Sequence, residues 1–435
     1  MNKAGFLAAT VILAAALTGC SPANVAPAQT PTTATPTPTP SPTAILPALT
    51  PPRQFDAVHP VRLSPVDQVS AGTLSGDVFI TVNANTVWGI RVHDGSVAFS
   101  TPLGGASPAV CWQQVVDANR VYTVTLNEAS DSTVPTTAQV TAVDRASGAL
   151  VWTYQPPADA LLAGADCSSA TLTLTMTRHG LVVSLSQTDQ ATLGNPTTSL
   201  SWMLDPSSGQ PLWQTDTAVL ATDGADFGVS VAIAQIPTPM GVFFYQASPV
   251  NLATGEIGDA FWQTANSMQL AGRYQLAGRT GNNLILLAHT AGTIMTDTTV
   301  YQVSTTTGQA TPQPVVKLQL PNLGDCQVVV TDRLVCTATN NPTLAYGISL
   351  TDGSQVWQHP FKSADSVATP VLFGGYLYGF DPERHVSYVL DTSDGNVMQA
   401  AAYPPAIAAN ETGLVFIVPQ DGNSAWQCWW VPALA

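Results

Sequence analysis

The sequence predicts an all-β fold, a β-propeller of four-stranded blades, from three observations. A short motif around a glycine recurs seven times. Runs of alternating or β-branched residues, as expected for strands, usually precede the motif. After residue 55 no segment has the apolar period of an amphipathic helix. Repeats of roughly 50 residues that each supply four strands are typical of propeller blades.

The repeated motif places polar residues at fixed distances before its glycine. The residue directly before the glycine is Asp, Ser or Thr in every copy, and the residue four before it is always polar. Four copies carry an aromatic residue four positions after the glycine: Phe99, Trp152, Trp213 and Trp357. In the fourth copy Trp262 comes later, after a small insertion. The seven glycines are Gly95, Gly148, Gly209, Gly255, Gly308, Gly353 and Gly395.

This chemistry predicts a tight hairpin turn followed by a strand that packs against a neighbouring sheet. Glycine supplies the positive φ that such turns need, and the polar side chains can bond to turn amides. The aromatic residue offers a large apolar face for packing between sheets. Further strands are expected over 76–83, 118–126, 169–176, 241–246, 282–290, 326–338, 374–381 and 413–420.

The motif resembles the repeat of the quinoprotein-type, or PQQ-like, β-propellers, roughly Asp-x-x-Thr-Gly-x-x-x-Trp. Residues 144–152 and 205–213 match it best, and the resemblance covers residues 76 to about 430. In that family the motif lies between the third and fourth strands of a blade. The resemblance therefore implies the same position for the seven glycines here.

The ends of the domain favour eight blades. The tail contributes GLVFIVPQ and SAWQCWWVPAL, two or three strands of one more blade. A lone strand at 59–66 precedes the first repeat, and pairing it with the tail would close the ring without an open edge. Seven blades is the alternative if the tail only covers the ring.

The first twenty residues have the organisation of a bacterial lipoprotein signal. Lys3 precedes an apolar run from Ala4 to Leu17, shorter than the roughly 20 residues that span a bilayer. The segment 17–20, Leu-Thr-Gly-Cys, resembles the lipobox, whose Cys takes the lipid. We expect residues 1–19 to be a signal peptide and Cys20 to anchor the chain to the outer side of the cell membrane.

A linker and a large domain follow Cys20. Between residues 21 and 52, ten of 32 residues are Pro and eight are Thr, and none is charged, so this segment cannot bury a core. We therefore assign 20–54 to a lipidated linker and 55–435 to the propeller. The chain after Arg53 has 11 Lys plus Arg and 28 Asp plus Glu, a net charge of −17. Such charge disfavours nucleic acid and favours a basic partner.

Enzyme chemistry finds little support in the sequence. PQQ-binding members of the family use a disulfide between adjacent cysteines, and this chain contains no Cys-Cys pair. No Gly-x-Ser-x-Gly, Ser-x-x-Lys or His-Glu-x-x-His motif occurs, and the histidines lack metal-ligand spacing. We therefore expect a non-enzymatic propeller without a cofactor or metal. It would be similar in class to the lipoprotein that helps assemble outer-membrane β-barrels, and would bind an envelope protein.

Two other functions stay open: a PQQ-dependent or carbohydrate-active enzyme, and a solute-binding lipoprotein. A cluster of Trp426, Trp429 and Trp430 could form a sugar platform, although packing of the closing blade explains it better. Cys326 and Cys336 bracket a short hairpin at a separation that suits a disulfide. Cys111 and Cys167 could bridge adjacent blades.

The lipobox leads to a direct test. Cys20→Ala removes the thiol that would carry the lipid, so the variant is expected to leave the membrane fraction or to remain unprocessed. Detergent phase partitioning and mass spectrometry of the mature N-terminus measure both effects. Wild-type partitioning of the variant would contradict the lipoprotein interpretation.

Overall fold

The computed structural model has two units by internal contact, residues 1–48 and 49–435, and the described residues all belong to the second. Cys20, the signal segment and the whole linker, residues 20–54, lie outside them. The described residues are 55–56, 59–67, 69, 71–83, 85–104, 109–127, 137–157, 170–189, 195–236, 242–263, 272–291, 296–310, 316–320, 323–330, 332–338, 343–361, 371–381, 386–401, 404–419 and 426–434.

The described strands form four-stranded antiparallel sheets, which we number as blades in chain order. Blade 1 comprises β2 (Thr73–Ser75), β3 (Val78–Asn83), β4 (Thr86–Arg91) and β5 (Val97–Pro102). Blade 2 comprises β6 (Ala109–Val116), β7 (Arg120–Asn127), β8 (Thr137–Asp144) and β9 (Leu150–Tyr154). Blade 3 comprises β10 (Ala170–Met176), β11 (Leu181–Asp189), β12 (Asn195–Leu204) and β13 (Pro211–Thr215). Blade 4 comprises β14 (Ala218–Leu220), β15 (Phe227–Ile236), β16 (Val242–Asn251) and β17 (Trp262–Gln263).

The second half of the unit repeats this plan. Blade 5 comprises β18 (Gly272–Thr280), β19 (Asn283–Ala291), β20 (Thr296–Ser304) and β21 (Val316–Leu320). Blade 6 comprises β22 (Leu323–Val330), β23 (Arg333–Ala338), β24 (Thr343–Ser349) and β25 (Gln355–Phe361). Blade 7 comprises β26 (Val371–Phe373), β27 (Tyr376–Asp381), β28 (Val386–Asp391) and β29 (Val397–Ala401). Blade 8 comprises β30 (Ala406–Asn410), β31 (Gly413–Pro419), β32 (Trp426–Pro432) and the N-terminal β1 (Val61–Asp67).

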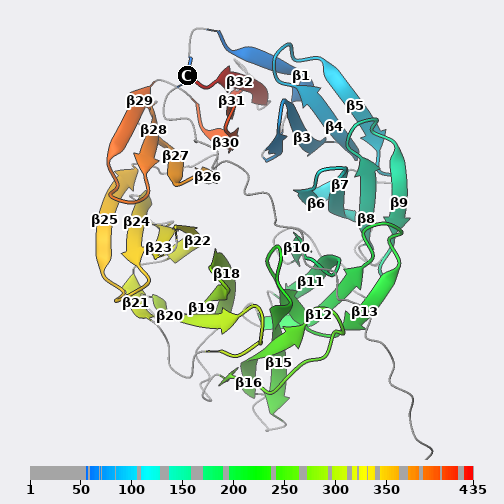
Figure 1. Ribbon diagram of the computed structural model, residues 1–435, viewed down its shortest axis with the longest axis vertical. Helices are drawn as coiled ribbons and strands as arrows, with labels where there is room; N and C mark the ends of the chain where they lie inside the picture. The colour runs from blue at the N-terminus through cyan, green and yellow to red at the C-terminus, as the bar shows by residue number, and fades with distance from the viewer. Residues whose placement is uncertain are drawn as a thin grey trace, which may run out of the picture. The chain divides into compact units, whose positions relative to one another are not determined.

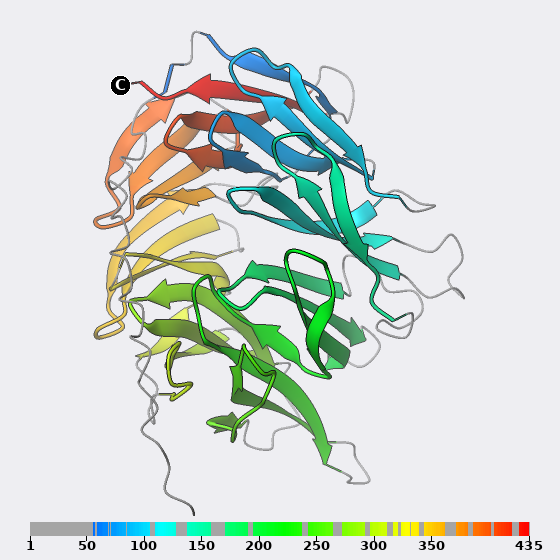
Figure 2. The same ribbon diagram turned by 45° about the vertical axis from the view of Figure 1, so that its right-hand side comes forward.

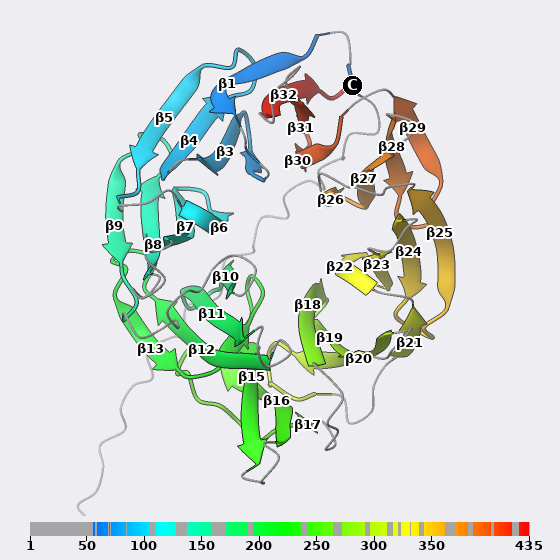
Figure 3. The ribbon, with the colours of Figure 1, turned by 180° about the vertical axis from the view of Figure 1, so that it is seen from behind.

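The blades follow one another around a ring in the order of the chain (Figure 1). The first strand of each blade faces the centre, and fourth strands such as β5, β9, β13, β25 and β29 lie on the circumference (Figures 1 and 3). Figure 2 shows neighbouring sheets stacked against each other. The predicted all-β propeller is confirmed, with eight blades rather than seven.

The ring is closed by strands from opposite ends of the chain. β1 pairs antiparallel with β32, with Val61 opposite Trp430. Before β1, Phe55 forms a β-bridge with Ala433, and the Asp56 N–H donates to the Pro432 carbonyl over 2.9 Å. The sequence prediction that the early strand completes the last blade is therefore confirmed.

The hydrophobic core consists of layers between neighbouring blades. Between blades 2 and 3, Leu126, Leu185 and Trp202 are fully buried in one cluster. Similar clusters join other neighbours, for example Val229 and Leu284 between blades 4 and 5. Because each layer belongs to two sheets, the blades stabilise one another.

The seven motif glycines lie in the turns between third and fourth strands, where each adopts a φ between +67° and +76°. In each turn the glycine N–H donates to the carbonyl of the residue four before it, over 2.7–3.0 Å. Positive φ is strained for residues with a Cβ, which accounts for the repeated glycine.

The aromatic residue of one blade packs on the turn glycine of the next. A Cβ added to Gly148 would lie 2.4 Å from the Cβ of Phe99, and one added to Gly209 would lie 2.6 Å from the Trp152 ring. Trp213 packs on Gly255 and Trp357 on Gly395 in the same way. The three Trp indole N–H groups also donate to carbonyls of these turns, over 2.8–2.9 Å. The side chain of Trp262 lies outside the described residues.

Blade 4 differs from the strands expected from sequence. The segment 241–246 was expected to precede the hairpin as a separate strand, but its described residues begin β16, which runs on to the turn itself. The second strand is β15, which was not among the expected strands although its Phe, Val and Ile residues alternate with Gly, Ser and Ala.

The contact between a turn glycine and the aromatic ring predicts that two glycines of similar φ, Gly148 and Gly104, lose different amounts of stability on substitution. Gly148→Ala should destabilise by roughly 2–4 kcal/mol, because left-handed strain of about 1–2 kcal/mol adds to overpacking against Phe99. Gly104 has a φ of +74°, and no atom of the described residues lies within 4 Å of an added Cβ, so Gly104→Ala should show the strain alone. Urea unfolding measures both, and equal losses would argue against the contact.

Candidate functional site

The best-defined surface is the face of the ring that carries the short turns. In a four-stranded antiparallel blade, the turns between strands 1 and 2 and between strands 3 and 4 lie at the same end. We call the surface formed by these turns the turn face. Connections on the opposite face lie largely outside the described residues.

Aspartates cap the turns on this face from the position four before the glycine. Asp144 Oδ1 accepts the N–H and hydroxyl of Ser147 over 2.8 and 2.6 Å. Asp205 does the same with Ser207, over 2.6 and 2.5 Å. Asp391 repeats the arrangement in blade 7. The polar residue of the motif therefore holds the turn in place through backbone amides.

A second group of aspartates lies directly before the glycine. Asp94 Oδ1 accepts the Ser96 N–H over 2.9 Å, and Asp352 accepts that of Ser354 over 3.0 Å. Hydrogen bonds from these serines lower the pKa of both carboxyls, as those from Ser147 and Ser207 lower the pKa of Asp144 and Asp205. All four are therefore ionised at neutral pH.

Arginines on this face are engaged by main-chain carbonyls. Arg120 donates to the Pro206 carbonyl of blade 3, which also accepts the Trp152 indole N–H. Arg145 reaches the Ser75 carbonyl of blade 1 over 3.3 Å, and Arg279 reaches that of Asp223 over 2.9 Å. These cations thus join neighbouring blades, and the charge of Arg120 also contributes to the lowered pKa of Asp144 and Asp205.

A polar contact joins blades 3 and 4. Asp226 Oδ1 lies 2.9 Å from Arg178 Nε and 2.8 Å from His179 Nε2. The side chains of Arg178, His179 and Asp226 are 50%, 28% and 29% exposed, respectively. The Asp226 N–H also donates to the Thr305 carbonyl of blade 5. This cluster links three successive blades, and we assign it a structural role.

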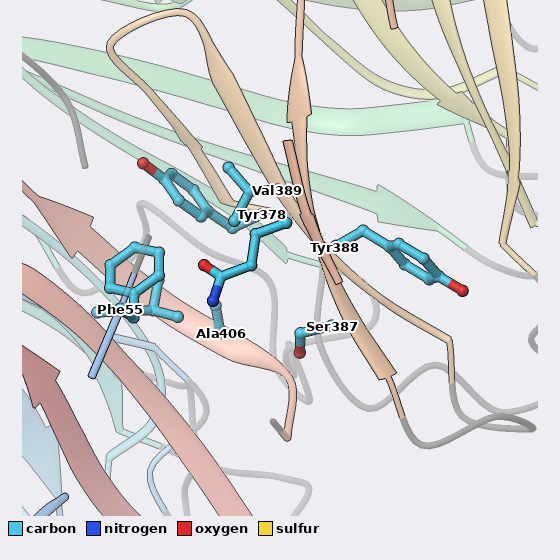
Figure 4. Close-up of a pocket in the computed structure, with 9 residues that line it drawn as sticks. Phe55, Tyr378, Ser387, Tyr388, Val389 and Ala406 are labelled. Carbon is cyan, nitrogen blue, oxygen red and sulfur yellow. The ribbon is translucent and has the colours of Figure 1, made fainter. Parts of the chain in front are cut away.

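A small apolar pocket lies between blades 7 and 8. Figure 4 shows Phe55 and Tyr378 on one side of it, whereas the Tyr388 ring points away from both. The Phe55 and Tyr378 rings meet edge to face at 5.8 Å, and burial raises the pKa of Tyr378. Gln399 Oε1 is buried there without a hydrogen-bond partner among the described residues. Phe55, the first residue after the linker, thus lines the pocket between blades 7 and 8.

The tryptophans near the C-terminus contribute to packing. Trp430 is 5% exposed in the core between blades 8 and 1, and its ring meets His93 edge to face at 5.3 Å. Trp429 packs on the cluster that contains Phe55. The side chain of Trp426 lies outside the described residues. The two described indoles therefore favour core packing over a sugar platform.

The cysteines occupy three settings. Cys326 and Cys336 lie directly opposite each other on β22 and β23 and form the disulfide predicted from their spacing. Cys111 is disulfide-bonded, whereas Cys167, its proposed partner, lies outside the described residues. Cys428 is buried in the core.

Two sequence and structural features bear on cofactor and metal binding. The chain has no adjacent cysteines. Within the described ranges, no three His, Cys, Asp or Glu side chains gather closely enough to hold a metal ion. In the same part of the chain, no helix has the length and apolar character needed to cross a bilayer.

Comparison with known proteins identifies structural similarity only. No protein-family model and no curated protein matches the sequence. The chain is similar to BamB from Moraxella catarrhalis, with 15% identity over 87% of this chain and 100% of the other, at a TM-score of 0.49. It is also similar to the Dos1 propeller (9% identity, coverage 85% and 95%, TM-score 0.51). A europium-containing methanol dehydrogenase shows 10% identity, coverage of 88% and 93%, and a TM-score of 0.47. At such identities the similarity supports the propeller fold and no particular activity.

The capped aspartates predict a pH dependence of stability. Because their pKa is lowered in the folded state, the unfolded chain binds protons more readily, so stability is lost as pH falls below about 4. A D144N/D205N double variant keeps the capping oxygens without the charges and should lose less stability between about pH 5 and pH 2.5. Urea unfolding across this range measures the slope. A double variant that loses stability as steeply as wild type over this range would contradict the role of the two charges.

Proposed function

We propose that this protein is a lipid-anchored propeller on the outer side of the cell membrane that binds a partner protein and acts as a scaffold in the envelope. The observation that carries the proposal is the turn face, where capping carboxylates recur around a closed ring. A rigid platform that displays many turns is well suited to protein binding.

The charges on this face support a basic partner. The carboxylates of Asp94, Asp144, Asp205 and Asp352 are held ionised by their hydrogen bonds. The neighbouring Arg120 donates to the Pro206 carbonyl, and its charge also lowers the pKa of Asp144 and Asp205, but the net charge of −17 after Arg53 leaves the domain strongly acidic. Complementary charge would speed association and select against acidic partners.

The N-terminal segment supports the anchored location. The lipobox at 17–20 and the uncharged Pro/Thr-rich linker would hold the domain away from the membrane. A polyproline II segment rises about 3.1 Å per residue, so the linker could separate lipid and propeller by up to roughly 100 Å.

Partner binding should weaken with salt. The full-length protein is immobilised in detergent and exposed to an envelope extract. It is expected to retain a basic partner at about 0.1 M NaCl and to release it by about 0.5 M. The reason is that salt shortens the distance over which charges on the two proteins attract each other. A D144N/D205N/D391N variant keeps the capping oxygens and should retain less partner, measured by quantitative mass spectrometry. Retention that is independent of both salt and these substitutions would contradict the electrostatic basis.

The enzyme alternative has its own measurement. The purified protein with PQQ and calcium should not oxidise alcohols or aldoses in a dye-linked assay. Cofactor-dependent turnover, or a stoichiometric PQQ absorbance after gel filtration, would overturn the scaffold proposal.

A further inference from the structure

The fourth strands on the circumference are exposed sheet edges that carry little charge. β9 and β13 are the terminal members of their sheets, and neither contains a charged residue. The same holds for β5 and β29. Proteins commonly protect such edges with Lys, other charges or Pro, because unpaired backbone groups can recruit another strand. These edges lack charges of that kind, although β13 begins with Pro211 and β5 ends with Pro102.

A β-bulge occurs at the same position of several of these strands. In blade 2, Val143 pairs with Leu150 and Ala142 with Trp152, so Val151 is the extra residue. In blade 3, Leu204 pairs with Pro211 and Met203 with Trp213, leaving Leu212. Blades 6 and 7 repeat the pattern with Val356 and Met398. A bulge re-aims the side chain of its extra residue.

The bulge residues are large, apolar and exposed. Val151 is 41% exposed and Leu212 is 55% exposed, and Leu150, beside Val151, is 54% exposed. Single exposed apolar residues need no explanation, but these recur at one structural position on uncharged edges. Blades 2 and 3 are adjacent, so their exposed residues lie on neighbouring strands of the circumference (Figure 1).

We propose that the outer edges of blades 2 and 3, β9 and β13, bind an extended strand of the partner protein, a strand with apolar side chains and a basic residue at one end. This inference rests on the proposed protein-binding function and specifies where the partner binds. Strand addition uses the backbone groups of the edge for affinity and side-chain contacts for specificity.

The chemistry of the occupant follows from the groups around the edge. The exposed apolar side chains of Leu150, Val151 and Leu212 would pack against apolar side chains of the incoming strand. Asp144 and Asp205 lie six residues before Leu150 and Pro211, at the turn that begins each outer strand, and both carboxyls have a lowered pKa. A Lys or Arg at the adjacent end of the incoming strand would complement them.

The short length of the edges limits what can bind. β9 and β13 each span five residues, and the bulge interrupts the ladder near their start. Only a short segment of another chain can pair with these edges, which disfavours aggregation by repeated strand addition. A second copy of this chain is a poor occupant, because two domains of charge −17 repel each other.

Edge variants test the proposal in the full chain. In a V151K/L212K variant, exposed apolar side chains become cations that repel a basic strand end, with little expected effect on folding. Val356→Lys, at the same bulge position of blade 6, is the matched control. Partner capture from the envelope extract should fall at least tenfold for the double variant and stay within twofold of wild type for the control. Urea unfolding verifies that all three proteins are folded.

A defined peptide tests the backbone requirement. Lys-Val-Thr-Val-Thr-Val-Lys, labelled with fluorescein, should bind wild type by anisotropy, and its affinity should fall at least tenfold when alternate backbone nitrogens are methylated. Equal affinity of the two peptides, or no binding at millimolar concentration, would overturn strand addition.

The outcomes separate this inference from the proposed function. If wild type captures a partner and the double variant captures it equally, the edge assignment is wrong while the scaffold function stands. Equal loss in Val356→Lys would also refute the assignment to blades 2 and 3. If wild type captures nothing, the scaffold function itself fails. A concentration-dependent dimer in sedimentation that V151K/L212K dissolves would show a second copy as the occupant and overturn the proposal.

Discussion

An aromatic ring packed on the bare glycine of the next blade is the contact on which the rest of this propeller depends. It requires the left-handed turn, because a Cβ at Gly148 or Gly209 would occupy the space of Phe99 or Trp152. It places the indole where it can donate to a carbonyl of the adjoining turn. Through this contact the conformation of one five-residue turn determines the spacing of two sheets, so a local sequence motif acts on the tertiary structure.

The same contact explains which parts of the molecule were predictable. The glycine, its preceding polar residue and the following aromatic are close in sequence and repeat in register, so they predicted the propeller. The two terminal strands then predicted eight blades. β15 was missed although its alternating Phe, Val and Ile residues fit a strand, because the residues just before the turn placed the expected strand at 241–246. The carbonyl contacts of Arg120 and Arg279, and the bulges at Val151 and Leu212, join residues whose relation depends on the folded blade. No pattern of residues in the sequence predicts these contacts or these bulges.

The molecule combines two surfaces of different chemistry. The turn face is polar, and hydrogen bonds hold its carboxylates ionised. The circumference at β9 and β13 offers short, uncharged edges with apolar bulge residues. Because the two surfaces meet where each outer strand leaves its turn, a partner that engages both would have its orientation fixed by charge and its register fixed by apolar contact. Such division of roles is common in specific interfaces.

The closure of the ring by β1 and β32 has a consequence for biogenesis. Val61 and Trp430 are partners although nearly the whole domain lies between them in sequence. A contact of such range carries a large loop-closure entropy and forms late. A chain that crosses a membrane with its N-terminus first would expose β1 long before β32 emerges. Until β32 is available, β1 has no strand to pair with, so the ring cannot close before the C-terminal segment is in place.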